Sequence, residues 1–154
     1  MPISAGEPAP TFTLLDENEA ERSLSDYRGK PVVLYFYPKD DTPGCTKEAC
    51  GFREDYSAYE NAGVEILGVS PDSPKSHARF KAKYDLPFHL LADTEKEVLK
   101  AYNAWGLKKS YGREYEGVLR TTFLIDSDGN IAKVFKNVKP AGHSEEILAA
   151  LQGL

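Results

Sequence analysis

The 154 residues of this chain fit one domain covering positions 1–154, long enough to bury a hydrophobic core without help from disulfides. Its formal net charge of -5, with Lys and Arg scattered along the sequence, argues against a nucleic-acid-binding surface. The first residues form neither a basic start nor a long apolar segment, so we expect a cytoplasmic protein that does not enter a membrane.

The first half of the sequence predicts a hairpin, a buried strand and a helix. Alternating apolar residues between positions 12 and 24, interrupted by a polar turn, predict a short β-hairpin. Residues 32–37 are apolar at every position, which is typical of a central strand covered on both faces. Apolar and aromatic residues then recur every three or four positions over residues 45–59, which predicts a helix.

The second half alternates strands and helices. The expected elements are a strand at 64–70, a helix at 74–84, a strand at 88–91, a helix at 94–102 capped by Thr94, a loop at 105–117, strands at 118–125 and 131–138, and a helix at 144–151. This order predicts an α/β fold with a central mixed β-sheet, helices on both faces of that sheet, and an N-terminal β-hairpin.

The two cysteines, Cys45 and Cys50, follow the predicted buried strand 32–37 through a loop rich in Pro, Asp and Gly. A strand, loop and helix in this order deliver the first helical turn to the open edge of a sheet, where ligands of α/β proteins bind. In a reducing compartment, a cysteine pair is more often catalytic, redox-sensing or metal-binding than structural. The C-x4-C spacing and the isolation of the three histidines argue against a zinc site, so we expect neither a metal nor a bound cofactor.

Cys45 is expected at the third position of its helix, with Thr42 at the N-cap and Pro43 at the first position. The helix N-terminus favours a thiolate there by about 0.3 to 2 kcal/mol, which is too little for the thiolate to predominate at neutral pH. A second cation is therefore needed, and Arg120 is our candidate because it precedes residues 121–125 on a strand of buried character, where an arginine is out of place without a partner. The alternatives are an Arg120 that points to water and a role for Lys39, Lys47 or Arg53.

The spacing of Cys45 and Cys50 has a geometric consequence. Five residues along an α-helix place the two Cα atoms roughly 8 to 9 Å apart. A disulfide needs a Cα separation below about 7 Å. A bond between these two cysteines would therefore require the start of the helix to unwind, and the protein would have two redox-dependent shapes.

Residues 37–53, YPKDDTPGCTKEACGFR, resemble the active-site stretch of the peroxiredoxins, and closely that of the bacterioferritin comigratory protein, or Q-type, subfamily. The specific part is the pattern P-x-x-x-T-x-x-C formed by Pro38, Thr42 and Cys45. The resemblance extends over nearly the whole chain through residues 6–12, 68–72, 120–126 and 142–143. One departure is the first hairpin turn, where residues 19–20 are Glu-Ala at a place that is commonly Gly in the family.

The resemblance implies a thioredoxin-like fold and a thiol-dependent peroxidase of the atypical 2-Cys type, acting on hydrogen peroxide and organic hydroperoxides in antioxidant defence. It implies that Cys45 is the peroxidatic nucleophile and Cys50 the resolving cysteine of the same chain, with Thr42 and Arg120 in polar contact with the reacting atoms and Pro38 shielding them. It also implies recycling by thioredoxin or a similar dithiol reductant, and we expect a monomer.

Two rival functions remain open from the sequence. A cysteine-pair redox sensor, or an interaction switch, would use Cys45 and Cys50 to change a surface without catalytic turnover. A disulfide oxidoreductase of the thioredoxin type is the other, although that chemistry normally uses a C-x-x-C motif, which this sequence lacks.

Overall fold

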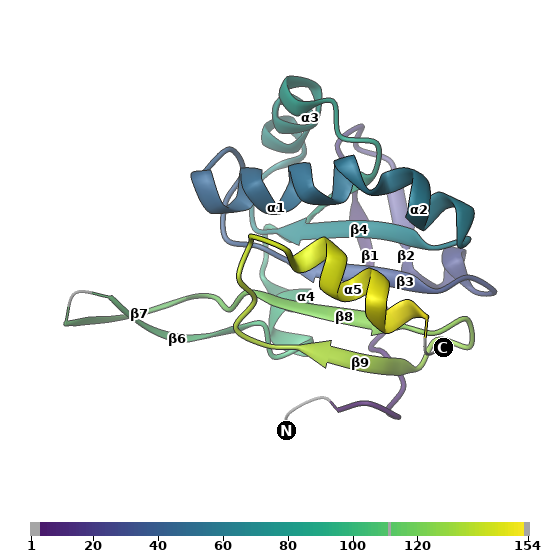
Figure 1. Cartoon of the computed structure of the whole chain (residues 1–154). Helices are drawn as coiled ribbons and strands as arrows, with labels where there is room; N and C mark the ends of the chain where they lie inside the picture. Colours follow the sequence, from purple (N-terminus) through teal and green to yellow (C-terminus); the bar gives the residue numbers. More distant parts are fainter. Residues whose placement is uncertain (1–3, 111, 153–154) are drawn as a thin grey trace.

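The computed structural model describes residues 4–110 and 112–152, which contain a seven-stranded sheet in the order β2-β1-β5-β4-β3-β8-β9 (Figure 1). The strands are β1 (Thr13–Leu15), β2 (Glu21–Ser23), β3 (Val32–Phe36), β4 (Glu65–Ser70), β5 (His89–Ala92), β8 (Thr121–Ile125) and β9 (Ile131–Phe135). Strands β3, β4 and β5 are parallel, whereas β1, β8 and β9 pair antiparallel with their neighbours. The predicted mixed sheet and N-terminal hairpin are therefore confirmed.

Helices cover both faces of this sheet. They are the 3-10 helix η1 (Leu24–Tyr27) and the α-helices α1 (Pro43–Glu54), α2 (Tyr56–Asn61), α3 (Pro74–Tyr84), α4 (Glu97–Ala101) and α5 (His143–Leu151). In Figure 1, α1, α2 and α5 lie in front of the sheet and α4 lies behind it. Within the described residues, no helix has the length and apolar character needed to cross a membrane.

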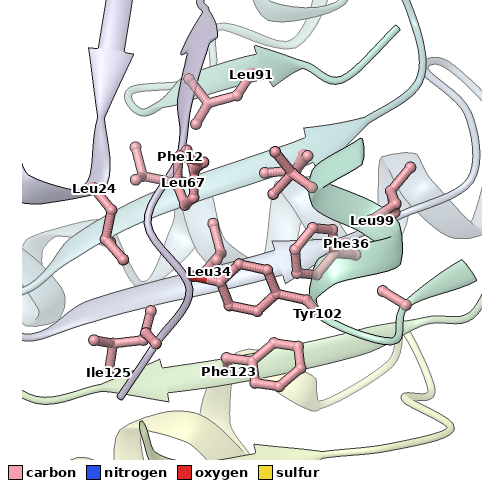
Figure 2. Close-up of a cluster of buried hydrophobic side chains, with 14 of the residues drawn as sticks. Phe12, Leu24, Leu34, Phe36, Leu67, Leu91, Leu99, Tyr102, Phe123 and Ile125 are labelled. Carbon is pink, nitrogen blue, oxygen red and sulfur yellow. The ribbon is translucent and has the colours of Figure 1, made fainter. Parts of the chain in front are cut away.

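The buried strand β3 separates two hydrophobic cores. Its residues Val32, Leu34 and Phe36 point into the core shared with α4, where aromatic and aliphatic side chains from distant parts of the chain meet (Figure 2). Tyr102 is central to this core, with ring contacts to Phe36 and Phe123 at centroid distances of 5.4 and 5.0 Å. Because both faces of β3 are covered, the strand is apolar throughout, as the sequence predicts.

The opposite core holds α1 against the sheet. Phe52 of α1 is fully buried and contacts the rings of Tyr35 and Tyr59 at 4.8 and 5.9 Å. The hydroxyl of Tyr59 donates to the backbone carbonyl of Ser144 at the start of α5. The middle of α1 is thus fixed by aromatic packing, and this sets where the first turn of the helix lies relative to β3.

Within the range 105–117, predicted as a loop, the described residues form two paired strands, and residue 111 lies outside the described residues. Strands β6 (Trp105–Ser110) and β7 (Arg113–Val118) pair only with each other and project beyond the end of the main sheet (Figure 1). Leu107 and Tyr115 are exposed on this hairpin. The loop prediction was wrong because these strands reach the core only at their base, through Trp105 and Val118, and so lack the alternating buried face from which a strand is detected in a sequence.

The predicted strand 118–125 is also divided. Val118 ends β7, and β8 begins only at Thr121. Arg120 therefore lies at the crossing between the projecting hairpin and the main sheet. The backbone of Arg120 belongs to neither strand, and its side chain turns toward α1.

Two helix predictions need correction. The helix predicted to reach residue 59 begins at Pro43, as the predicted N-cap requires, but it breaks at Asp55, whose backbone angles of φ -95° and ψ 7° separate α1 from α2. Thr94 does not cap the next predicted helix, since α4 begins after Lys96 in a left-handed conformation. The carboxylate of Asp93 instead accepts the backbone N–H of Leu99, so a residue outside the expected capping position satisfies this helix start.

Candidate active site

Cys45 lies in the first turn of α1, where the chain has just left β3. Thr42 occupies the N-cap position in an extended conformation, and Pro43 is the first helical residue, so Cys45 is the third. The Cys45 side chain is only 1% exposed and belongs to the core that packs under α1. The structure thus agrees with the predicted placement, in which unpaired N–H groups and the helix dipole favour an anion.

The Arg120 guanidinium joins Cys45 to a second residue of α1. Its Nη2 donates to Cys45 Sγ over 3.1 Å, and its Nη1 donates to Glu48 Oε1 over 2.9 Å. The Arg120 side chain is 18% exposed, so the alternative of an arginine pointing to water is wrong. Of the rival cations, Lys39 and Lys47 are exposed, while Arg53 donates to the carbonyl of Tyr84.

Glu48 is the anionic partner of Arg120 and is almost fully buried. Its Oε2 atom has no hydrogen-bond partner among the described residues. Burial raises the pKa of Glu48 from its ordinary 4.5 to about 7, although the Arg120 guanidinium opposes this shift. The fork of Arg120 is therefore shared between a carboxyl group that ionises near neutrality and the thiol of Cys45.

Gly44 makes room for this arrangement. A Cβ atom at this position would lie 3.0 Å from Nη2 of Arg120 and 3.5 Å from Cγ of Pro140. Real Cβ atoms rarely come so close to a neighbour, and the guanidinium is held at both of its terminal nitrogens. A side chain at position 44 would therefore push Arg120 away from Cys45.

Thr42 and Pro38 are placed at the entrance to α1, with one correction to the expected contacts. The hydroxyl of Thr42 does not cap the helix but donates to the carbonyl of Lys39 over 2.8 Å. Its oxygen keeps free lone pairs and can accept a hydrogen bond. Pro38 is half-buried directly after the buried Tyr37.

Cys50 lies further along the same helix and is half-buried. Both thiols are free in this structure. Since α1 is continuous from Pro43 to Glu54, the two cysteines are separated by a helical rise of about 7.5 Å, too far for a disulfide without unwinding.

A buried polar network anchors the loop between β3 and α1. The carboxylate of Asp40 accepts from the hydroxyl of Tyr37 at 2.6 Å and from Ser76 at 2.8 Å, and it pairs with Nδ1 of His77 at 2.7 Å. Nε2 of His77 lies 2.9 Å from the carbonyl of Leu91, so this nitrogen carries a proton. The loop that ends at Thr42 is thereby tied to α3 and β5.

Two groups of side chains bring carboxylate and imidazole atoms within 4.8 Å of one another. They are Asp16 with Glu17 and His89, and Asp40 with Asp72 and His77. Each is held by its own hydrogen bonds, such as those of Glu17 to His89 and of Asp40 to His77. Neither group includes Cys45 or Cys50, so the structure links no metal ligand set to the thiols among the residues it describes.

Three functional neighbours were missed by the sequence analysis. Glu48 carries a signal in retrospect, because it lies one helical turn after Cys45 and so on the same face of α1. Asp40 and His77 carry no comparable signal. They are 37 residues apart, and their contact depends on the packing of α3 against the sheet.

A buried thiol at a helix N-terminus, bonded to a guanidinium beside a mixed α/β sheet, defines a thiol-based redox enzyme of thioredoxin-like fold. The family model described as "AhpC/TSA family" matches residues 5–134. The chain belongs to this family, and the predicted peroxiredoxin, a thiol-dependent peroxidase, is confirmed.

Similar proteins support the assignment over the full chain. A putative peroxiredoxin bcp of Coxiella burnetii is 51% identical, covering 98% of this chain and 100% of the relative. Peroxiredoxin Bcp of Bacillus subtilis is 46% identical, covering 100% and 98%.

Solved structures give the same result for the fold. A peroxiredoxin Q mutant of Xylella fastidiosa superimposes with a TM-score of 0.93 at 34% identity, covering 99% of this chain and 98% of that one. The bacterioferritin comigratory protein of Xanthomonas campestris, studied for its alkyl peroxide reduction activity, gives a TM-score of 0.91 at 37% identity, with 97% and 98% coverage. The predicted thioredoxin-like fold is therefore confirmed.

Proposed function

We propose that this peroxiredoxin reduces hydrogen peroxide and organic hydroperoxides with Cys45 as the attacking thiolate. The observation that supports this most directly is the 3.1 Å contact between Arg120 Nη2 and Cys45 Sγ at the N-terminus of α1. A guanidinium and a helix N-terminus both stabilise a thiolate, which is the nucleophilic form of cysteine.

In the first step the Cys45 thiolate attacks one oxygen of the hydroperoxide. The S–O bond forms as the O–O bond breaks, and the leaving oxygen takes a proton and departs as water or an alcohol. Cys45 is oxidised by two electrons to a sulfenic acid, and the peroxide is reduced by the same two electrons. Negative charge moves from sulfur to the leaving oxygen, and Arg120 stabilises it during this transfer.

Thr42 and Pro38 have supporting roles in this step. Because the Thr42 hydroxyl donates its own proton to Lys39, its oxygen would accept the proton of a bound hydroperoxide and orient the O–O bond. Pro38 is half-buried beside the loop and offers no N–H, so it would shield the thiolate without adding a competing donor.

In the second step Cys50 attacks the sulfenic sulfur of Cys45. An S–S bond forms, and the hydroxyl group leaves as water after taking a proton. The helical separation of the two cysteines requires the first turns of α1 to unwind before this bond can form. An external dithiol then reduces the disulfide and is itself oxidised.

We propose thioredoxin as that dithiol and a cytoplasmic monomer as the working form. Both reacting cysteines belong to one chain and one helix, so the cycle needs no residue from a partner subunit. A cytoplasmic location would keep the cysteine pair under reducing conditions between turnovers.

The two cysteine variants test this scheme. Cys45→Ser should abolish peroxide consumption, whereas Cys50→Ser should consume about one equivalent of peroxide per chain and stop as a sulfenic acid or mixed disulfide. Peroxide consumption would be followed with thioredoxin, thioredoxin reductase and NADPH, and the stalled species by mass spectrometry. Equal loss of the first turnover in both variants would contradict the assignment, and one turnover without recycling by any dithiol would favour a redox sensor.

A further inference from the structure

Lys108 lies on strand β6 of the projecting hairpin, directly opposite Tyr115 of β7. The register of β6 and β7 places Lys108 opposite Tyr115 and Gly106 opposite Gly117, on the same face of the hairpin. Lys109, the next residue, is on the other face with Glu114. The two neighbouring lysines therefore face different surroundings.

The side chain of Lys108 folds toward the base of the hairpin. The residue directly opposite Lys108 is Tyr115, and Gly117 lies two residues nearer to the main sheet. A Cβ atom at Gly117 would be only 3.2 Å from Cδ of Lys108, so the lysine stem extends toward the main sheet. The absence of a side chain at Gly117 leaves the space that the Lys108 stem occupies. Three residues beyond Gly117 the chain reaches Arg120, so the Lys108 stem runs along the hairpin toward the segment that carries the guanidinium bound to Cys45.

The electrostatic surroundings of Lys108 agree with this direction. The side chain is half-buried, and burial together with the Arg120 guanidinium lowers the pKa of Lys108, while Cys45 acts in the opposite sense. No carboxylate is among the groups that act on Lys108 in the described part of the chain. Arg120 shares its charge with Glu48, whereas the anion that acts on Lys108 among the described residues is Cys45.

We propose that Lys108 is a second cation of the active site, stabilising the Cys45 thiolate and the charge that passes to the leaving oxygen, and that Gly117 is needed to place it. This inference rests on the proposed role of Cys45. The ammonium acts through space and is not required to touch the peroxide. The projecting hairpin is then part of the active site.

The test compares Lys108→Met with Lys109→Met, a matched variant on the opposite face of the same strand. The second-order rate constant for sulfenic acid formation with hydrogen peroxide would be measured by stopped flow in reduced protein. We expect a loss of about three- to ten-fold for Lys108→Met, the size of effect of one partly screened unit charge. Lys109→Met should stay within two-fold of the unmodified protein, and Lys108→Arg should retain most of the rate.

Two further measurements separate charge from packing. The difference between the unmodified protein and Lys108→Met should shrink in 1 M salt, where the Debye length falls to about 3 Å. Gly117→Ala should also slow sulfenic acid formation when it is introduced alone. Combined with Lys108→Met, it should cause no further loss of rate. A loss that is independent of salt would overturn the electrostatic role.

The remaining outcomes are also decisive. If Lys108→Met and Lys109→Met behave alike, Lys108 has no special position. If the loss is confined to a carboxylate-bearing hydroperoxide and is absent with hydrogen peroxide, Lys108 binds substrate and does not stabilise the thiolate. If Cys45 in the unmodified protein does not react with hydrogen peroxide, the proposed function itself fails, which is a different result from a change in rate.

Discussion

Glu48→Gln should stabilise the folded protein above neutral pH. The Glu48 side chain is 1% exposed, and its Oε2 has no partner among the described residues. Burial raises its pKa to about 7, whereas the unfolded chain has the ordinary value of 4.5. Between these two values the folded state holds a proton that the unfolded state has lost, so the free energy of unfolding falls as the pH rises through this window.

The size of the effect follows from the two pKa values of Glu48. Each pKa unit corresponds to 1.36 kcal/mol, so the loss is of order 3 kcal/mol and is complete above about pH 7. A glutamine cannot ionise, but its oxygen can still accept from Arg120. We therefore expect Glu48→Gln to match the unmodified protein near pH 5 and to be more stable by about 2 to 3 kcal/mol near pH 8.

Urea unfolding of the reduced protein between pH 5 and pH 8.5 measures this difference. Glu54→Gln is the control, since Glu54 is on the same helix with a side chain that is 73% exposed. It should change the pH dependence little. A stability difference between Glu48→Gln and the unmodified protein that is constant with pH, or that reverses with rising pH, would refute a buried Glu48 with a raised pKa.

Two other perturbations test the site. Arg120→Met should slow the reaction of Cys45 with peroxide by about two to four orders of magnitude, because a charged contact at 3.1 Å contributes about 3 to 5 kcal/mol. Arg120→Lys should recover only part of the rate, since a lysine cannot bridge Glu48 and Cys45. An Arg120→Met protein with an unchanged stopped-flow rate would remove Arg120 from the mechanism. Hydrogen exchange should show that amides of residues 45–52 lose protection only after oxidation, as α1 unwinds to let Cys50 reach Cys45. Local unwinding would be contradicted by an oxidised chain that carries the disulfide while these amides stay protected. It would also be contradicted if oxidation produced only intermolecular dimers.

Much of the fold could be predicted because its main elements have strong local signals. Strand β3 is apolar throughout, and α3 begins with the N-cap Ser73 followed by Pro74, both visible in the sequence. The hairpin β6–β7 could not be predicted in this way. Its strands contact the core only at their base, through Trp105 and Val118, so no alternating pattern of buried residues marks them.

The active site was predictable where it depends on local geometry. The Thr42 N-cap, the proline after it and the third helical position of Cys45 follow from residues 38–45 alone. Arg120 was a candidate because a charged residue is unusual beside a strand of buried character, here residues 121–125. The contact between Arg120 and Glu48 could not be predicted because it joins residues 72 apart. The fold of the whole chain decides such contacts.

The proposed mechanism makes two opposed demands on α1, which would be rigid for the first chemical step and would unwind for the second, and the contacts around the helix are compatible with both. On its N-terminal side, Asp40 is bound to His77 and Asp41 to Lys83 and Tyr84 of α3. On its C-terminal side, Arg53 donates to the carbonyl of Tyr84. Both cysteines lie between these anchors, so the unwinding we propose would be confined to a short segment with fixed ends. The reaction itself would favour that unwinding, because conversion of the Cys45 thiolate to a neutral sulfenic acid removes the anion that Arg120 attracts at the helix start.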